Sequence, residues 1–345
     1  MMLFSQLGFA TQIVLIVPDK EGPAFWSLVH QVTAASAQSL NVQLEVIYGG
    51  ENRFATLKII EAIVARPVKP DYLIFRPFHG NAKNVFDQIE ARGISFVTLE
   101  QAFSGKEAME LQRPKQKYKN WIGEVNYDNA NGGVLLLNAL IKEHRIRQPA
   151  VKPSIIGMGG DFDNLSISRQ QVLSNLDRRG DIVLNQVFPT YWDPQNIATN
   201  FELMLKRYPQ TNIFWCAGDQ LALVTLKQHQ LLSKKTIIVG GFDWLPEALI
   251  NIQQGHIAAS VGGHFLMGAI AITKIFDYQH GIDRFLDLSQ HYDFEVITKD
   301  NVNSYVDFMQ QEKWQKVDFN QFSAFKMGQQ PQALTVHNII KSIKE

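Results

Sequence analysis

The sequence alternates short apolar runs with stretches in which apolar residues recur at helical spacing. The first run covers residues 13–17, and apolar positions at helical spacing follow it as far as Ala35. Three further runs have similar neighbours, at residues 44–48, 72–75 and 96–99. Runs that are apolar on both faces, separated by amphipathic helices, predict a parallel sheet covered on both sides.

A second series of the same kind follows a polar, basic stretch at residues 106–119, where we place a hinge. It begins with a strand at 121–125 and a helix at 129–144. Later strands are expected at 154–158, 182–187, 212–216 and 236–240, and later helices at 168–178, 194–207, 221–230 and 246–254. The chain is therefore predicted to form two similar α/β halves.

The end of the chain departs from this alternation. A strand at 258–261, a helix at 268–278 and a strand at 292–297 are expected, and such late elements could return to complete the first half. The predicted lobes are residues 11–124 with 264–291 and residues 125–263 with 292–325, and residues 326–345 form a C-terminal tail.

Length and composition fit a folded protein of two or three domains. The chain has 345 residues, of which 46% are hydrophobic and 19% charged, values ordinary for a compact protein. Its 33 basic and 33 acidic residues balance, so we expect no nucleic-acid partner. The single cysteine, Cys216, lies in an apolar run and is interpreted as a small buried hydrophobe.

The N-terminus leaves two interpretations open. Residues 1–10 are apolar and end in Gly8-Phe9-Ala10, a small-x-small pattern that resembles the end of a signal peptide, although no basic segment precedes it. The segment is either part of a secretory leader or a frayed apolar end. No apolar run reaches the ~18 residues that a membrane span needs.

Signatures of catalysis, cofactor binding and metal binding mostly fail. The sequence has no phosphate-binding G-x-x-x-x-G-K-[ST], no G-x-S-x-G and no H-E-x-x-H. Residues 157–160 lack the third glycine region of a dinucleotide fingerprint, and Asp161 and Asp163 lack the remainder of a calcium loop. We therefore expect no enzyme, no cofactor and no metal site.

Polar and aromatic residues recur just beyond the carboxyl ends of the predicted strands, where open α/β sheets bind their ligands. These candidate binding residues are Phe25, Trp26, Glu100, Gln101, Arg169, Trp192, Asp219, Phe242, Asp243 and His264. Aromatic faces suit the C–H patches of a sugar ring, carboxylates accept hydrogen bonds from hydroxyls, and guanidinium groups donate to them. The set predicts a site for a polyol.

Each candidate also has a purely structural interpretation. Phe25 and Trp26 could anchor a core, and Trp192 could pack beneath a helix start. The charged members could be solvated, cap helices or form turns, and His264 could belong to a hinge. Their shared location, rather than any single residue, favours a binding site.

Several segments together resemble the type I periplasmic binding proteins, the ribose and galactose receptor class. They are residues 22–27, 71–75, 97–100, 128–133, 168–169, 208–219, 239–243 and 254–260, and the resemblance spans most of residues 11–300. Residues 293–299 and the Phe25-Trp26 pair look closest to the autoinducer-2 receptor branch.

The resemblance implies two Rossmann-like lobes with parallel sheets, joined by a hinge of three strands near residues 123–126, 262–263 and 291–294, with ligand between them. By motif position, Phe25 or Trp26 would form one wall of the site. Glu100 and Asp243 would accept hydrogen bonds from ligand hydroxyls, and Arg169 would donate across the cleft. Trp192 would stack on the ligand, and Phe242 would lie beside Asp243.

Two positions depart from the family pattern. Gly218-Asp219 stands where sugar receptors commonly have Asn-Asp, and Gly263 matches the last contact position, often Gln or Asn. The loss of two polar partners either argues against an ordinary pentose or hexose or leaves room for a larger ligand, and His264 could reach into that space.

The function implied is that of a monomeric periplasmic solute-binding protein, which captures a small sugar-like ligand and presents it to the permease of an ABC transporter. The alternative is a sensor that docks a membrane signalling protein. A repressor of this fold would need an N-terminal helix-turn-helix of ~60 residues, whereas ten residues precede the first expected strand. A hydrolase on the same scaffold is the remaining alternative.

Overall fold

The computed structural model describes residues 11–18, 24–176, 180–233, 235–285, 292–310, 313–328 and 330–344. The chain divides into two compact units. Unit 1 comprises Met1–Asn126, Leu266–Gln290 and Trp314–Glu345, and unit 2 comprises Tyr127–Phe265 and His291–Lys313.

Unit 1 is built on five parallel strands in the order β2-β1-β3-β4-β5. The strands are β1 (Gln12–Val17), β2 (Gln43–Tyr48), β3 (Tyr72–Phe75), β4 (Ser95–Leu99) and β5 (Trp121–Val125). The sheet is doubly wound, and the strand order reverses between β1 and β3.

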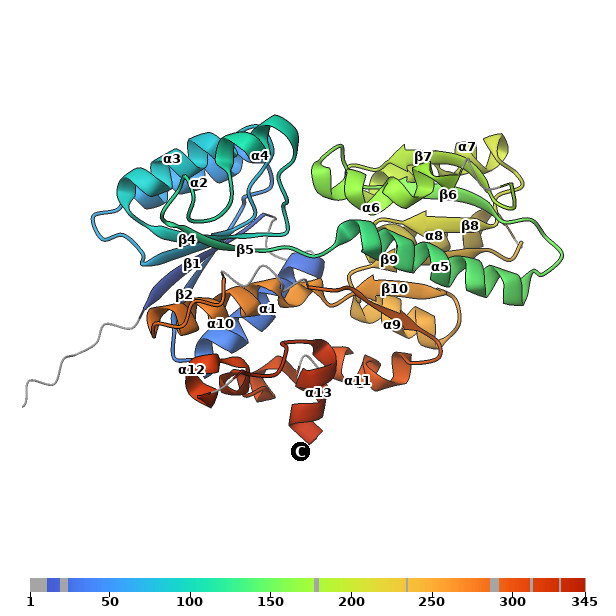
Figure 1. The fold of residues 1–345 in the computed structure, drawn as a ribbon. Coiled ribbons are helices and arrows are strands. Elements are labelled where there is room, and N and C mark those ends of the chain that lie inside the picture. The colour runs from blue at the N-terminus through green and yellow to red at the C-terminus, as the bar shows by residue number, and fades with distance from the viewer. Residues whose placement is uncertain are drawn as a thin grey trace, which may run out of the picture. The chain divides into compact units, whose positions relative to one another are not determined.

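Helices cover both faces of this sheet. On one face lie α2 (Arg53–Val64) and α3 (Ala82–Arg92), and on the other α1 (Ala24–Ser39) packs beside α10 (Met267–Gln279) (Figure 1). The core beneath α2 and α3 is rich in aromatic rings, with the Phe86 ring centroid 4.8 Å from that of Phe96 and 5.0 Å from that of Trp121.

The predicted hinge at residues 106–119 is wrong, because this stretch belongs to unit 1. It contains α4 (Gly105–Leu111), and Leu111 and Tyr118 are buried in the unit 1 core. The backbone N–H groups of Lys119 and Asn120 donate to the carboxylate of Glu90, each at 2.9 Å. The polar residues of this stretch form the outer surface of a packed segment.

Unit 2 repeats the same plan with one strand more. Its six strands follow the order β11-β10-β9-β8-β6-β7, and β11 alone is antiparallel to its neighbour. They are β6 (Ser154–Gly159), β7 (Val183–Pro189), β8 (Ile213–Cys216), β9 (Ile238–Phe242), β10 (Ala259–Gly262) and β11 (Glu295–Thr298). Read from β7, the five parallel strands have the order of unit 1, which confirms the prediction of two Rossmann-like lobes.

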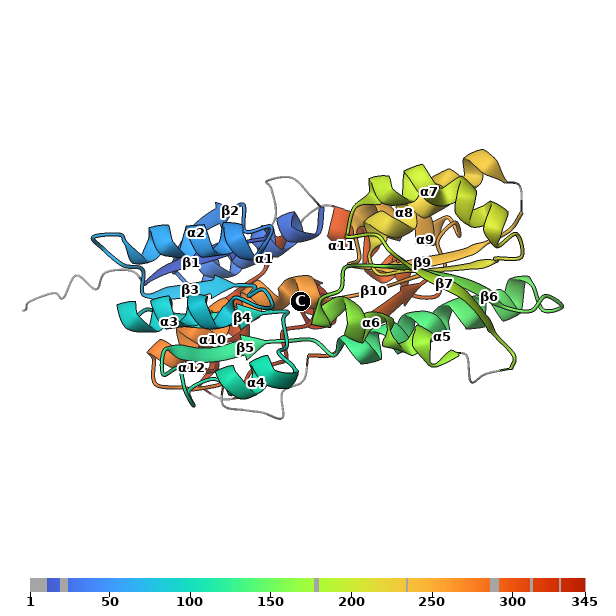
Figure 2. The ribbon, with the colours of Figure 1, turned by 90° about the horizontal axis from the view of Figure 1, so that it is seen from above.

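Helices also cover both faces of the unit 2 sheet. One face carries α5 (Asn129–Arg147) and α6 (Asn164–Ser174). The other carries α7 (Pro194–Arg207), α8 (Asp219–Leu232) and α9 (Pro246–Gln253) (Figure 2).

The C-terminal stretch differs from its predicted place. Residues 314–325 were expected in the second lobe and residues 326–345 as a separate tail, but both group with unit 1. The chain passes from one unit to the other at 126/127, 265/266 and 290/291, close to the predicted crossings, and again at 313/314.

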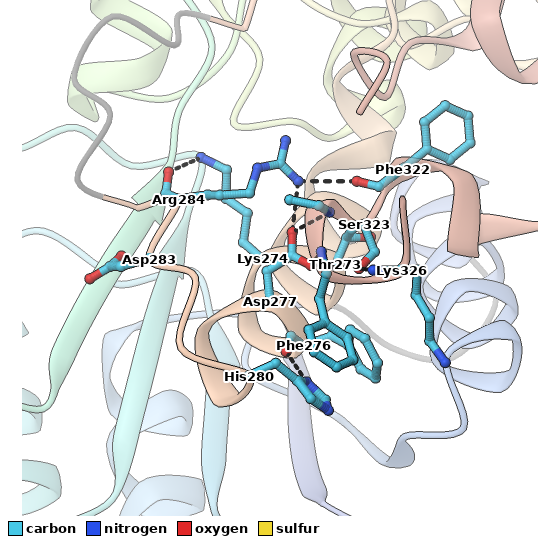
Figure 3. Close-up of polar contacts among 12 residues, drawn as sticks. Thr273, Lys274, Phe276, Asp277, His280, Asp283, Arg284, Phe322, Ser323 and Lys326 are labelled. Carbon is cyan, nitrogen blue, oxygen red and sulfur yellow. Dashed lines mark hydrogen bonds and ion pairs between the residues drawn. The ribbon is translucent and has the colours of Figure 1, made fainter. Parts of the chain in front are cut away.

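The buried carboxylate of Asp277, near the end of α10, explains this placement (Figure 3). It accepts hydrogen bonds from Ser323 Oγ at 2.5 Å, from the N–H groups of Ala324 and Phe325 at 3.0 and 3.1 Å, and from Arg284 at 2.9 Å. The partners 323–325 are 46 to 48 positions away along the chain, so one side chain fixes the C-terminal stretch to unit 1. The short helix α12 (Ala324–Met327) begins here, and α13 (Val336–Lys344) follows.

The proposed leader at residues 1–10 lies outside the described residues. Cys216 is fully buried, as interpreted, and burial raises the pKa of its thiol. None of the helices in the described ranges combines the length and apolarity that a bilayer crossing requires.

Candidate functional site

The strand order of unit 2 reverses between β6 and β8, so a ligand crevice is expected beyond the carboxyl ends of these strands. Gly160 follows β6 and Gly218 lies just beyond β8. A Cβ added at Gly160 would clash with the Trp192 indole, at 2.5 Å from its Cε2 atom, and one added at Gly218 would lie 3.7 Å from the same ring system. The indole therefore covers the backbone at the switch point, and Gly160 is required for this close approach.

The loop that carries Trp192 has an unusual backbone. Tyr191 and Trp192 both have positive φ, 54° and 60°, a conformation that costs a non-glycine residue ~1 kcal/mol or more. Asp193 then caps α7 by accepting a hydrogen bond from the Gln195 N–H at 2.9 Å. The indole of Trp192 remains 37% exposed, so it is only partly covered at the start of α7.

Arg169 lies in the second turn of α6, which begins four residues earlier than predicted. The cause is Asp163, whose carboxylate caps the helix by accepting a hydrogen bond from the Ser166 N–H at 2.8 Å. As a result Arg169 is only 2% exposed, which contradicts its interpretation as a solvated helix residue.

The guanidinium of Arg169 is held by hydrogen bonds and rings. It donates to the carbonyl oxygen of Ala217 at 2.7 Å and to Asn129 Oδ1 at 3.0 Å. It also lies 4.2 Å from the ring centroid of Phe242 and 5.9 Å from that of Trp192, within reach of cation–π attraction. The Arg169 head group is thus fixed near the end of β8.

Asp243, directly after β9, brings a carboxylate to the same place. Its φ is 107°, and its Oδ2 atom lies 3.2 Å from the point where a Cβ at Gly218 would sit. Trp192 reaches that point from another side, so Trp192, Arg169 and Asp243 come together in unit 2. His264 Nε2 lies 3.3 Å from Asp243 Oδ1, and its ring is buried against Tyr127 and Phe294.

Asp219 and Phe242, both predicted as ligand contacts, are completely buried. Asp219 Oδ2 accepts hydrogen bonds from the Leu245 N–H at 3.0 Å and from Ser260 Oγ at 2.8 Å. Burial, reinforced by the nearby Asp243 carboxylate, raises the pKa of Asp219 well above its usual value. These two side chains support the site without reaching its surface. The ring of Phe242 packs against the Arg169 guanidinium, and Asp219 accepts a hydrogen bond from the turn that follows Asp243.

In unit 1 the aromatic candidates lie at the start of α1. The rings of Phe25 and Trp26 meet edge to face with centroids 5.4 Å apart, and both side chains are half-buried. His30, one turn further along α1, has its Nδ1 atom 2.5 Å from the hydroxyl oxygen of Tyr48 at the end of β2. Sequence reasoning did not single out this pair.

Glu100 and Gln101 follow β4 and share a partner that sequence reasoning missed. Arg76, directly after β3, lies 3.5 Å from the Glu100 carboxylate and donates to Gln101 Oε1 at 3.4 Å. Its guanidinium lies 4.9 Å from the ring centroid of Phe78. The rule that selected the other candidates, a polar residue beyond a strand end, applies equally to Arg76 and could have found it.

The chemistry of the unit 2 set is that of noncovalent recognition. It combines a partly exposed indole face, a buried guanidinium and a carboxylate. Within the described ranges, no three His, Cys, Asp or Glu side chains gather in a way that could hold a metal ion.

Comparisons with known proteins agree with this architecture. A family model described as the periplasmic binding protein domain matches residues 13–281. No curated protein matches the chain. The structure of a periplasmic sugar-binding protein from Pseudomonas fluorescens is similar, with a TM-score of 0.80 and 22% sequence identity. The alignment covers 91% of this chain and 94% of that protein.

Two further solved structures show the same fold at lower identity. A periplasmic solute-binding protein of an ABC transporter from Actinobacillus succinogenes, with bound D-allose, is 19% identical, with a TM-score of 0.72 and coverage of 86% of this chain and 100% of its own. The binding protein of the arabinose ABC transporter from Shewanella, bound to L-arabinofuranose, is 16% identical, with a TM-score of 0.71 and coverage of 88% and 96%.

Proposed function

Because the chain belongs to the periplasmic binding protein family, we propose that it captures a sugar or sugar-like polyol reversibly in the periplasm and presents it to an ABC-type transporter. The observation that carries this proposal is the convergence of Trp192, Arg169 and Asp243 at the switch point of the unit 2 sheet. Solved proteins of the same fold with bound D-allose or L-arabinofuranose support the ligand class.

The chemistry of the three side chains favours a neutral, hydroxyl-rich ligand. The indole face of Trp192 offers an apolar surface to ring C–H groups. Asp243 supplies two carboxylate oxygens that accept from hydroxyls, and Arg169 supplies a guanidinium that donates. One positive and one negative group lie close together, so the pair presents no strong net charge that would select an ion.

In this proposal the unit 1 candidates provide a second set of contacts. Phe25, Trp26, Glu100 and Gln101 would engage the same ligand, and binding would favour a closed state only through contacts that an open state lacks. The transporter partner, the monomeric state and the likeness to autoinducer-2 receptors stay predictions, as does the sensor alternative.

Isothermal titration calorimetry with a panel of pentoses, hexoses and polyols tests the assignment. Arg169→Ala and Trp192→Ala should each weaken binding by ~1–3 kcal/mol, since a buried partner is left unpaired or a stacking face is lost. Arg145→Ala, an exposed arginine of the same unit, is the matched control and should bind as the unmodified protein does. Unchanged affinity in both site variants would refute the assignment.

The same samples address the enzyme alternative. The sugar recovered after incubation should be chemically unchanged, as judged by mass spectrometry. A native mass spectrum of the freshly purified protein should show a neutral polyhydroxylated molecule that leaves on dilution. Turnover of the bound sugar would instead support the hydrolase.

A further inference from the structure

A pocket of about 400 Å³ lies in unit 2 between the end of β7 and helix α7, outside the residues placed in the site above. Its size is within the range of ~300–1,000 Å³ typical of small-molecule sites. The lining residues are Phe188, Pro189, Thr190, Tyr191, Asn196, Ile197, Asn200, Leu203, Met204 and Arg207. Tyr191, the chain neighbour of Trp192, therefore connects this pocket to the candidate site.

An exposed pair of aromatic rings marks the connection. Tyr191 is 56% exposed and Phe162 is 65% exposed, and their ring centroids lie 5.9 Å apart. Phe162 is two residues beyond Gly160, on which the Trp192 indole rests. Exposed aromatic pairs beside a binding aromatic are surfaces on which a further sugar ring can pack.

The polar groups of the pocket are suited to hydroxyls. The side-chain amides of Asn196 and Asn200 donate to the backbone oxygens of Thr190 and Asn196 at 2.9 and 2.8 Å, and the described residues provide no donor to either amide oxygen. The guanidinium of Arg207 has no carboxylate partner among the described residues and contacts only the Tyr208 ring, 5.5 Å from its centroid. The pocket thus offers two acceptors and a cationic donor above an apolar floor.

We propose that this pocket is an outer subsite for a second sugar ring, so that the preferred ligand is a disaccharide or longer oligosaccharide whose inner ring occupies the site at Trp192. The inference rests on the proposed function and specifies the ligand class.

Calorimetry with matched pairs of saccharides tests the subsite. Each pentose or hexose of the panel is compared with di- and trisaccharides that end in that sugar. The unmodified protein should bind at least one oligosaccharide ten-fold or more tightly than the matching monosaccharide. The double variant Asn200→Ala/Arg207→Ala changes exposed side chains of α7, so it should fold normally and lose this gain while keeping the monosaccharide affinity within about two-fold.

Leu231→Ala, at a 70% exposed position on α8, is the matched control and should retain the full gain. Binding of a monosaccharide with no gain for any oligosaccharide, or a gain that survives in the double variant, would overturn the subsite and leave the proposed function intact. Failure of every saccharide to bind would overturn both.

Discussion

The two units place their candidate residues at the same edge of equivalent sheets, but they fix them by different means. In unit 1, Arg76 connects the side chains of Glu100 and the buried Gln101 through contacts of 3.5 and 3.4 Å. In unit 2, Arg169 is buried against the ring of Phe242, and it donates to the backbone oxygen of Ala217 at 2.7 Å and to Asn129 Oδ1 at 3.0 Å. Topology therefore selects where a site can form, and the packing beneath it decides how firmly the side chains are held.

The late parts of the chain sharpen this contrast. In unit 2 the segment that leads into β11 brings Phe294 against the rings of Phe242 and His264, with centroids 5.8 and 5.0 Å away. In unit 1 the late segments instead pack around Asp277, on α10. The added strand supports the candidate site in one unit, whereas the added C-terminal stretch stabilises the body of the other.

The largest effect is expected when Asp277 is replaced by alanine. The change leaves the Arg284 guanidinium without its buried partner and removes the acceptor of three further donors, so unfolding of unit 1 should become easier by ~3–5 kcal/mol. Hydrogen exchange should rise across unit 1, including residues 323–327, and change little in β6 to β11. The exposed Glu110→Ala in unit 1 is the control. Equal loosening of both units would contradict the assignment of the C-terminal stretch to unit 1.

Most of the fold could be predicted from periodicity, and the exceptions have physical reasons. Buried runs such as β3 and β8 leave little ambiguity, because strands covered on both faces are apolar throughout. The stretch at 106–119 looked like a hinge because the buried Leu111 and Tyr118 are isolated among charges. The contacts of Asp277 with residues 323–325 span 46 to 48 positions, and no local pattern encodes such partners.

The sequence was enough to predict where the candidate site lies, but not which of its side chains are exposed and which are buried beneath them. Strand ends indicated Trp192, Arg169 and Asp243, which the structure brings together. Which residue of the Phe242-Asp243 pair reaches the surface depends on the backbone, where Asp243 has a φ of 107°. The sequence does not display that angle.

The second prediction tests whether the unit 2 site depends on Gly160, the residue against which the Trp192 indole packs. In Gly160→Ala the new Cβ would lie 2.5 Å from Trp192 Cε2 and 2.6 Å from Ser166 Oγ, so the indole must move. Calorimetry should show sugar affinity reduced by about 100-fold, ~2.7 kcal/mol. Gly180→Ala, which would meet nothing within 4 Å, should leave affinity unchanged. If both variants bound sugar equally well, the Trp192 face would not be part of the site.

The smallest effect, when it is counted per pH unit, concerns the buried carboxyl of Asp219. Its pKa is raised in the folded protein, chiefly by burial and then by Asp243, whereas in the unfolded chain it is ordinary, so the folded state binds the extra proton. Asp219 therefore contributes stability at low pH that is lost as the pH rises from the unfolded pKa through the folded one.

The variant Asp219→Asn tests this pH dependence, because its side chain cannot titrate and its amide oxygen can still accept hydrogen bonds from Leu245 and Ser260. Between pH 5 and 8, the free energy of unfolding of the variant should rise relative to that of the unmodified protein by on the order of 1 kcal/mol per pH unit, as measured by thermal unfolding. The exposed control Asp300→Asn should show no such rise. Parallel stability curves for Asp219→Asn and the unmodified protein would show that Asp219 is ionised in the folded state.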